Sequence, residues 1–168
     1  LLKADMLCAQ GYPAQALQWL DAEKKRMPGN EEISRAIRNL AVALLRVGRL
    51  EEAEKTVRMG LSLEPESAEL HYHLGEVLHA RGRTRAALAA YKKAIERRPD
   101  YAAAINSGGI VYTSMGADES AEEQFRRAIA ARPEDAAGYV NLARLYLDGG
   151  KRDEAETLLR QAVAVAPE

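Results

Sequence analysis

The three histidines of this chain lie close together and are the first residues to consider as a chemical site. His71, His73 and His79 share one short stretch with Glu69 and Glu76. Histidine and carboxylate side chains are common Zn²⁺ ligands, but a helical zinc motif places its two histidines four residues apart, and no pair here has that spacing. We therefore predict no metal site. A metal held by Glu69, His73 and Glu76 remains an alternative, as does a surface whose charge changes near about pH 6–7 through histidine protonation.

Motifs for other catalytic chemistry are missing from the sequence. It contains no nucleophile motif, no phosphate-binding glycine loop after a strand and no CxxC pair. The glycine-rich run 107–110 falls inside a predicted helix, and Cys8 has no histidine near it in sequence, which predicts an inert thiol. We therefore predict that these residues form no enzyme and need no cofactor.

The charge balance and the single cysteine limit which classes of protein this chain can belong to. The 24 basic and 25 acidic residues give a formal net charge of −1, whereas nucleic-acid binders normally carry a basic surplus. One cysteine allows no disulfide within the chain, which fits a reducing compartment such as the cytoplasm and also a bacterial periplasm. No apolar run approaches the roughly 20 residues that span a bilayer. We predict neither nucleic-acid binding nor membrane insertion.

The elements that position these residues follow a single period of 34 residues. Five residue classes repeat at this interval: Pro65, Pro99, Pro133 and Pro167; Gly48, Gly82, Gly116 and Gly150; Ala53, Ala87, Ala121 and Ala155; Gly60, Ala94, Ala128 and Ala162; and Ala41, Gly75, Gly109 and Ala143. Glycine suits the left-handed residue that ends a helix, and proline stops a helix from propagating. Alanine or glycine inside a helix lets neighbouring helices approach closely. Larger apolar residues at helical spacing predict the rest of the core: Leu40, Leu74, Leu142, Leu44, Leu78, Tyr112, Tyr146, Val57, Tyr91, Phe125 and Leu159.

This period divides the chain into paired helices. Complete units are predicted at 34–67, 68–101, 102–135 and 136–168, after a partial, degenerate unit at about 1–30. We expect all ten helices to form one array, and the sequence to be a segment of a longer protein. The helices are expected near 1–10, 13–27, 31–47, 50–63, 67–81, 84–97, 101–115, 118–131, 135–149 and 152–165.

The pattern resembles the tetratricopeptide repeat (TPR) family, strongly from residue 34 onward. The segment 68–101 carries the family motif at Leu74, Gly75, Gly82, Ala87, Tyr91, Ala94 and Pro99. The resemblance implies an all-α solenoid of about ten helices, in which antiparallel pairs form a right-handed superhelix. Two departures stand out. Gly108 replaces the usual leucine, as a soft point or a tolerated packing gap, and His71 replaces a large apolar residue, for which we expect a partly buried ring with one satisfied nitrogen.

The family also implies where a ligand lies, because the first helix of each unit lines the concave side. Carrying over the family's groove positions predicts peptide contacts at Arg35, Arg38, Asn39, Tyr72, His73, Glu76, Asn106, Asn141 and Arg144. Arg35, Arg38 and Asn39 fall within one helical turn and are able to clamp a carboxylate. The alternative is that these arginines pair with Glu69 or Glu76 on the next unit.

A well-known variant of the family grips the C-terminal carboxylate of chaperone tails with Lys, Arg and Asn side chains. The corresponding positions here hold Arg38, Val42, His73, Ala103 and Ser107, so that clamp is missing. The sequence therefore argues against a chaperone-tail adaptor.

Three functions follow from the resemblance and the pattern. The leading hypothesis is a protein-interaction scaffold that binds a peptide or a partner-protein segment in the concave groove. An alternative is the targeting or substrate-recruiting arm of a larger enzyme, such as a glycosyltransferase. The third is end-to-end self-association, because the last helix presents Leu158, Leu159 and Val163 without a following polar helix.

Overall fold

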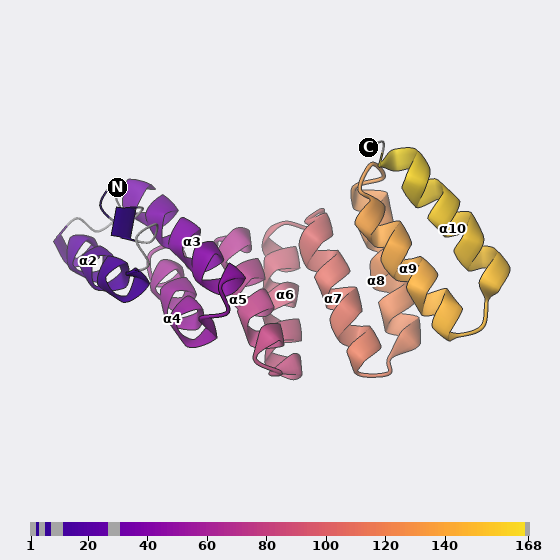
Figure 1. Ribbon diagram of the computed structural model, residues 1–168, viewed down its shortest axis with the longest axis horizontal. Coiled ribbons are helices and arrows are strands. Elements are labelled where there is room, and N and C mark those ends of the chain that lie inside the picture. The colour runs from indigo at the N-terminus through magenta and orange to yellow at the C-terminus, as the bar shows by residue number, and fades with distance from the viewer. Residues whose placement is uncertain (1–2, 4–5, 8–11, 27–30, 167–168) are drawn as a thin grey trace. The chain divides into compact units, whose positions relative to one another are not determined.

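Helices account for almost all of the regular structure in this chain. The computed structural model describes Lys3 and residues 6–7, 12–26 and 31–166. In this part of the chain it has nine α-helices and no strand (Figure 1): α2 (Pro13–Arg26), α3 (Glu31–Arg46), α4 (Leu50–Leu61), α5 (Ala68–Ala80), α6 (Thr84–Arg97), α7 (Ala102–Ser114), α8 (Asp118–Ala131), α9 (Ala136–Asp148) and α10 (Arg152–Val165). The predicted all-α class is confirmed. The predicted helix at 1–10 lies largely outside the described residues, as do Cys8 and Pro28.

The turn inside each helix pair is built on the predicted glycine. Gly48, Gly82, Gly116 and Gly150 all have positive φ, between 69° and 77°. The residue after each glycine donates its N–H to a carbonyl five residues back, as Arg49 does to Leu44 at 2.9 Å. This left-handed cap satisfies carbonyls that the end of a helix leaves without partners. The repeated glycines therefore set the positions of the tight turns.

Polar residues begin two of the helices one residue later than the sequence pattern predicted. The Ser67 hydroxyl accepts a hydrogen bond from the Leu70 amide at 3.4 Å, and the Asp135 carboxylate accepts one from the Ala137 amide at 3.0 Å. Both residues are N-caps, whose backbone is extended while the side chain binds the first turn. They start α5 and α9, the helices that carry five of the nine predicted contact residues.

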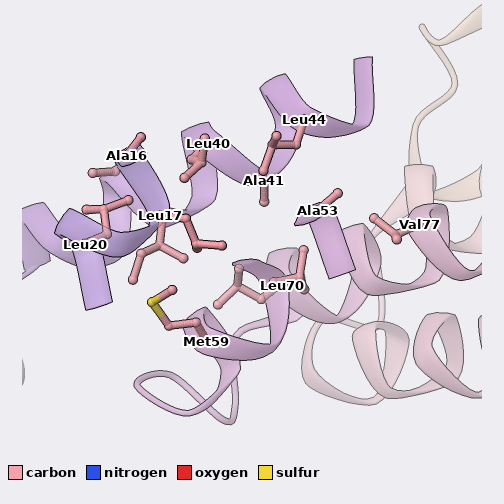
Figure 2. Packing of buried hydrophobic residues seen from close by; sticks show 13 residues of the cluster. Ala16, Leu17, Leu20, Leu40, Ala41, Leu44, Ala53, Met59, Leu70 and Val77 are labelled. Atoms are coloured by element: carbon pink, nitrogen blue, oxygen red, sulfur yellow. The ribbon is translucent and has the colours of Figure 1, made fainter. Parts of the chain in front are cut away.

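The chain forms two compact units, residues 1–90 and 91–168, and the division falls within α6. In the first unit α3 packs against α2, α4 and α5, and α4 also packs against α2 and α5. Figure 2 shows their shared core, in which small residues such as Ala41 and Ala53 lie among larger aliphatic ones. Leu20, Ile37 and Val57 are fully buried there. The alanines thus let the helices approach closely, and leucine, isoleucine and valine side chains fill the remaining space between them.

The second unit repeats this packing with α7 against α8 and α9, α8 against α9, and α9 against α10. Its core centres on Phe125, which is 1% exposed and is joined by Leu142, Ala143 and Tyr146. The small-residue series are buried as predicted. The core prediction is wrong at Leu159, which is 38% exposed, because no described helix packs against the outer face of α10.

Within the described residues, no helix is long and apolar enough to cross a membrane. Each unit instead buries its apolar side chains between helices. The fold thereby leaves the polar faces of α3, α5, α7 and α9 to carry the predicted contacts.

Candidate interaction surface

Two of the predicted arginines lie on α3, and one of them is held by acids of the neighbouring segment. Arg38 donates from Nη1 to Glu64 Oε2 at 2.7 Å, and its Nε lies 4.0 Å from Glu69 Oε2. Glu64 belongs to the same predicted repeat as Arg38, so the main partner is neither of the two acids named in the alternative, of which only Glu69 comes as near as 4.0 Å. Arg35 and Asn39 are exposed on the same helix. The positive charge of Arg38 is therefore largely balanced by Glu64, within the first compact unit.

The three predicted residues of α5 form one hydrogen-bonded group. The Tyr72 hydroxyl donates to Glu76 Oε1 at 3.0 Å, and His73 Nδ1 lies 2.8 Å from Glu76 Oε2. The rings of Tyr72 and His73 are 5.2 Å apart between centroids, at a tilt of 57°. Since both carboxylate oxygens of Glu76 already have a hydrogen-bond partner, the group presents an aromatic face beside an engaged acid.

The other two histidines, His71 and His79, each have at least one ring nitrogen buried inside the fold. His71 is buried rather than partly buried as expected, and its Nε2 lies 2.9 Å from the Pro65 carbonyl, which agrees with the expected single satisfied nitrogen. The Nδ1 atoms of His71 and His79 are buried without a hydrogen-bond partner. Among the described residues, no three His, Cys, Asp or Glu side chains gather as ligands of a metal ion.

The predicted residues of the second unit lie together across two helices. Arg144 donates from Nη2 to Asn141 Oδ1 at 3.0 Å, and Asn141 Nδ2 donates to Asn106 Oδ1 at 3.0 Å. Asn106 comes from α7 and the other two come from α9. Asn106 and Asn141 are half-buried and Arg144 is exposed. The hydrogen bonds therefore run in one direction, from the guanidinium through both amides.

Two aliphatic side chains lie on the same face of α9 as Arg144. Val140 is 44% exposed and Leu147 is 48% exposed, which is high for residues of this size. Neither residue is among the nine contact residues predicted from the sequence. The helical spacing of 140, 144 and 147 contains the signal that places all three on one face.

The junction between α4 and the turn after α5 holds a buried acid that was not among the predicted contact residues. Glu54 is 8% exposed, and its carboxylate accepts hydrogen bonds from Arg58 at 2.8 Å, Arg81 at 2.8 Å and Arg83 at 3.2 Å. The hydrogen bond from Arg58 holds the pKa of Glu54 below its ordinary value, although burial acts in the opposite direction. Of these three ion pairs, only the one between Glu54 and Arg58 is predictable from the sequence, because those residues are four apart.

An equivalent junction joins α8 to α9 in the second unit. The Tyr146 hydroxyl donates to Glu122 Oε1 at 3.0 Å and accepts from Arg126 Nη2 at 2.7 Å. Burial raises the pKa of Tyr146, and the hydrogen bond to Glu122 raises it further. Both junctions tie the second helix of one pair to the following pair.

The first unit also has a cavity of about 500 Å³ between α2 and α4. Leu17 and Met59 contribute apolar surface, and Asp21, Lys55 and Arg58 are among its charged lining residues. None of the predicted contact residues lines this cavity, so it is separate from the faces described above.

Paired helices with glycine turns, buried alanines and polar faces define a helical-repeat protein. Two tetratricopeptide repeat models match the sequence, one over residues 38–102 and one over residues 112–168. These matches cover more than two thirds of the chain. The chain belongs to the tetratricopeptide repeat family, as its sequence predicted.

Solved structures of similar fold span nearly the whole chain. MamA is 26% identical with a TM-score of 0.79, and the match covers 96% of this chain and 93% of MamA. TTC0263, a thermophilic TPR protein of Thermus thermophilus, is 26% identical with a TM-score of 0.75, covering 100% of this chain and 90% of that protein. YrrB, a TPR protein with an unusual peptide-binding site, is 21% identical with a TM-score of 0.72, covering 98% and 84%. No curated protein sequence matches the chain.

Proposed function

We propose that the chain is a protein-interaction scaffold that binds an extended segment of a partner protein along the first helices of its repeats. Membership of the tetratricopeptide repeat family and the fold shared with MamA favour an interaction scaffold in general. YrrB, which shares the fold, is described by its peptide-binding site, and this supports a peptide as the ligand.

The observation that carries the proposal is the hydrogen bond between Asn106 and Asn141, which joins the polar faces of α7 and α9. Amide side chains suit an extended chain, because their N–H groups donate to the carbonyls of a peptide backbone. In the first unit Tyr72 adds a rigid amphipathic contact, of the kind that is enriched at energetic centres of interfaces. Together, these groups make the first helices the proposed contact surface, while the single ten-helix array remains a prediction.

A binding selection tests this proposal. The chain, immobilised, is used to select peptides from a phage-displayed random library, and each selected peptide is measured by fluorescence anisotropy. We expect Tyr72→Ala or Asn141→Ala to weaken binding, while Lys93→Ala, an exposed change on α6, leaves it unchanged. If selection yields no peptide, or if Lys93→Ala weakens binding as much as the other changes, the proposed surface is wrong.

A second candidate function is self-association through the outer face of α10. Leu159 and Val163 are 38% and 75% exposed, whereas Phe125, which holds the position of Leu159 one repeat earlier, is 1% exposed. Exposed apolar residues at otherwise buried positions favour docking of another helix. Sedimentation velocity is expected to show concentration-dependent assembly that Val163→Lys weakens. A strict monomer at high concentration removes this candidate.

We further propose that these residues carry out no reaction themselves. The family consists generally of interaction modules, and this supports a non-catalytic role. A recruiting arm attached to a catalytic domain is compatible with the same surface. Sequencing the complete gene distinguishes the two arrangements, because only the second requires an adjoining enzyme domain.

A further inference from the structure

We infer that the α7–α9 face, formed by Asn106, Val140, Asn141, Arg144 and Leu147, binds an acidic side chain flanked by aliphatic residues in the partner segment. This inference rests on the proposed function and adds the chemical class of the ligand. Three features of the second unit support it: the direction of its hydrogen bonds, the charge of Arg144 and the placement of two exposed aliphatic residues.

The direction of the hydrogen bonds leaves this face rich in donors. Arginine can only donate, so its bond to Asn141 fixes Oδ1 of that amide as the acceptor. The Asn141 Nδ2 then donates to Asn106 Oδ1, which leaves the Asn106 amino group as a further donor. Both amide oxygens are already engaged, while Arg144 and Asn106 keep N–H groups for a ligand. An acceptor such as a carboxylate complements this arrangement.

The charge of Arg144 is not balanced by any acid that the structure describes. It forms no ion pair with any described residue, and Asp148, one turn further along α9, is exposed without bonding to it. By contrast, Arg38 is held by Glu64 at 2.7 Å. A ligand carboxylate at Arg38 competes with that acid, whereas at Arg144 it meets an unpaired guanidinium. Electrostatic complementarity therefore favours the α7–α9 face.

The two exposed aliphatic residues of α9 indicate that aliphatic side chains flank the acid of the ligand. Val140 and Leu147 are seven residues apart on α9, which corresponds to about 10.5 Å along the helix axis. Three residues of an extended chain span about the same distance. Arg144 lies between them, so the partner chain continues on both sides of its acid. This favours an internal Asp or Glu side chain over a C-terminal carboxylate.

The test uses the tetrapeptide acetyl-Leu-Glu-Ala-Leu-amide and its neutral counterpart, acetyl-Leu-Gln-Ala-Leu-amide, with isotopically labelled protein in NMR titrations. We expect the Glu peptide to shift the side-chain N–H signals of Arg144, Asn106 and Asn141, and to bind about fivefold more tightly than the Gln peptide, as for an exposed charged pair. Arg144→Gln is expected to abolish this preference, while Arg127→Gln, a change at an exposed arginine on α8, preserves it.

Other outcomes overturn the inference. Equal affinity for the two peptides, a preference that survives Arg144→Gln, or shifts centred on residues outside the α7–α9 face each contradict it. A third peptide, acetyl-Leu-Ala-Leu with a free C-terminal carboxylate and no acidic side chain, must bind more weakly than the Glu peptide, because tighter binding assigns the site to chain ends. Library peptides that bind through Tyr72 and Asn141 without any need for an acid leave the proposed function standing and refute only this inference.

Discussion

At the scale of single residues, a buried acid at a helix junction joins several arginines. Glu54 lies among Arg58, Arg81 and Arg83, and so joins α4 to the end of α5 and the turn that follows. A buried carboxylate in such a cluster stabilises the fold only while it is charged, because the loss of its charge leaves three guanidinium groups without their partner.

Glu54→Gln is therefore expected to destabilise the first unit by about 2 kcal/mol at neutral pH. The measurement is urea denaturation followed by circular dichroism. Glu51→Gln on the same helix is the control, because the Glu51 side chain is 88% exposed and lies 3.7 Å from Arg81. Equal stability of the Glu54 variant and the unchanged chain contradicts a structural role for the cluster.

The same acid predicts a pH dependence. The pKa of Glu54 is lowered in the folded chain from its ordinary value of 4.5, so its contribution is complete above about pH 4.5 and is lost as the pH falls through the folded pKa. The stability difference between the unchanged chain and Glu54→Gln is thus expected to shrink below about pH 4.5. Denaturation curves at a series of pH values measure it, and a difference that stays constant under acid excludes this linkage.

At the scale of helices, α7 contains two adjacent glycines, of which one is closely packed and the other has open space beside it. An added Cβ on Gly109 lies 2.5 Å from the Phe125 ring, whereas one on Gly108 meets nothing within 4 Å. Of the two interpretations of Gly108, this contact pattern fits the packing gap, because there is room for a side chain. Gly109 is small because the neighbouring phenylalanine leaves it no space.

Alanine substitutions separate the two positions. Gly108→Ala is expected to stabilise the chain by about 1 kcal/mol, since alanine favours the helix and its methyl group fits. Gly109→Ala is expected to destabilise it by about 1–3 kcal/mol through overpacking against Phe125. Thermal unfolding of both variants provides the measurement. Similar shifts in the same direction contradict the assignment of Gly109 as the closely packed position.

Local chemistry explains why the helices were predictable to within about two residues. The glycines with positive φ and the caps at Ser67 and Asp135 act over a few residues, so they are visible in the sequence. The partners of the site residues were less predictable. Arg38 meets Glu64 26 residues away, and Glu54 meets Arg81 27 residues away, which depends on how neighbouring helices are rotated against each other.

At the scale of the whole molecule, each unit has its own core, as expected for a chain whose repeats contact mainly their neighbours. Ile37 is buried among α2–α5, and Phe125 is buried among α7–α10. Such chains unfold in segments, because losing one set of neighbour contacts does not remove the others. The two units are therefore expected to respond separately to core mutations.

Phe125→Ala tests this expectation. It removes a side chain that is 1% exposed, at a cost of about 3–5 kcal/mol. Hydrogen exchange followed by mass spectrometry is expected to show faster exchange in α8 and α9, with little change in α3 and α4. The reciprocal variant Ile37→Ala is expected to expose α3 and α4 while sparing α9. Uniformly faster exchange in both variants contradicts segmental unfolding, because it requires the chain to open as one cooperative body.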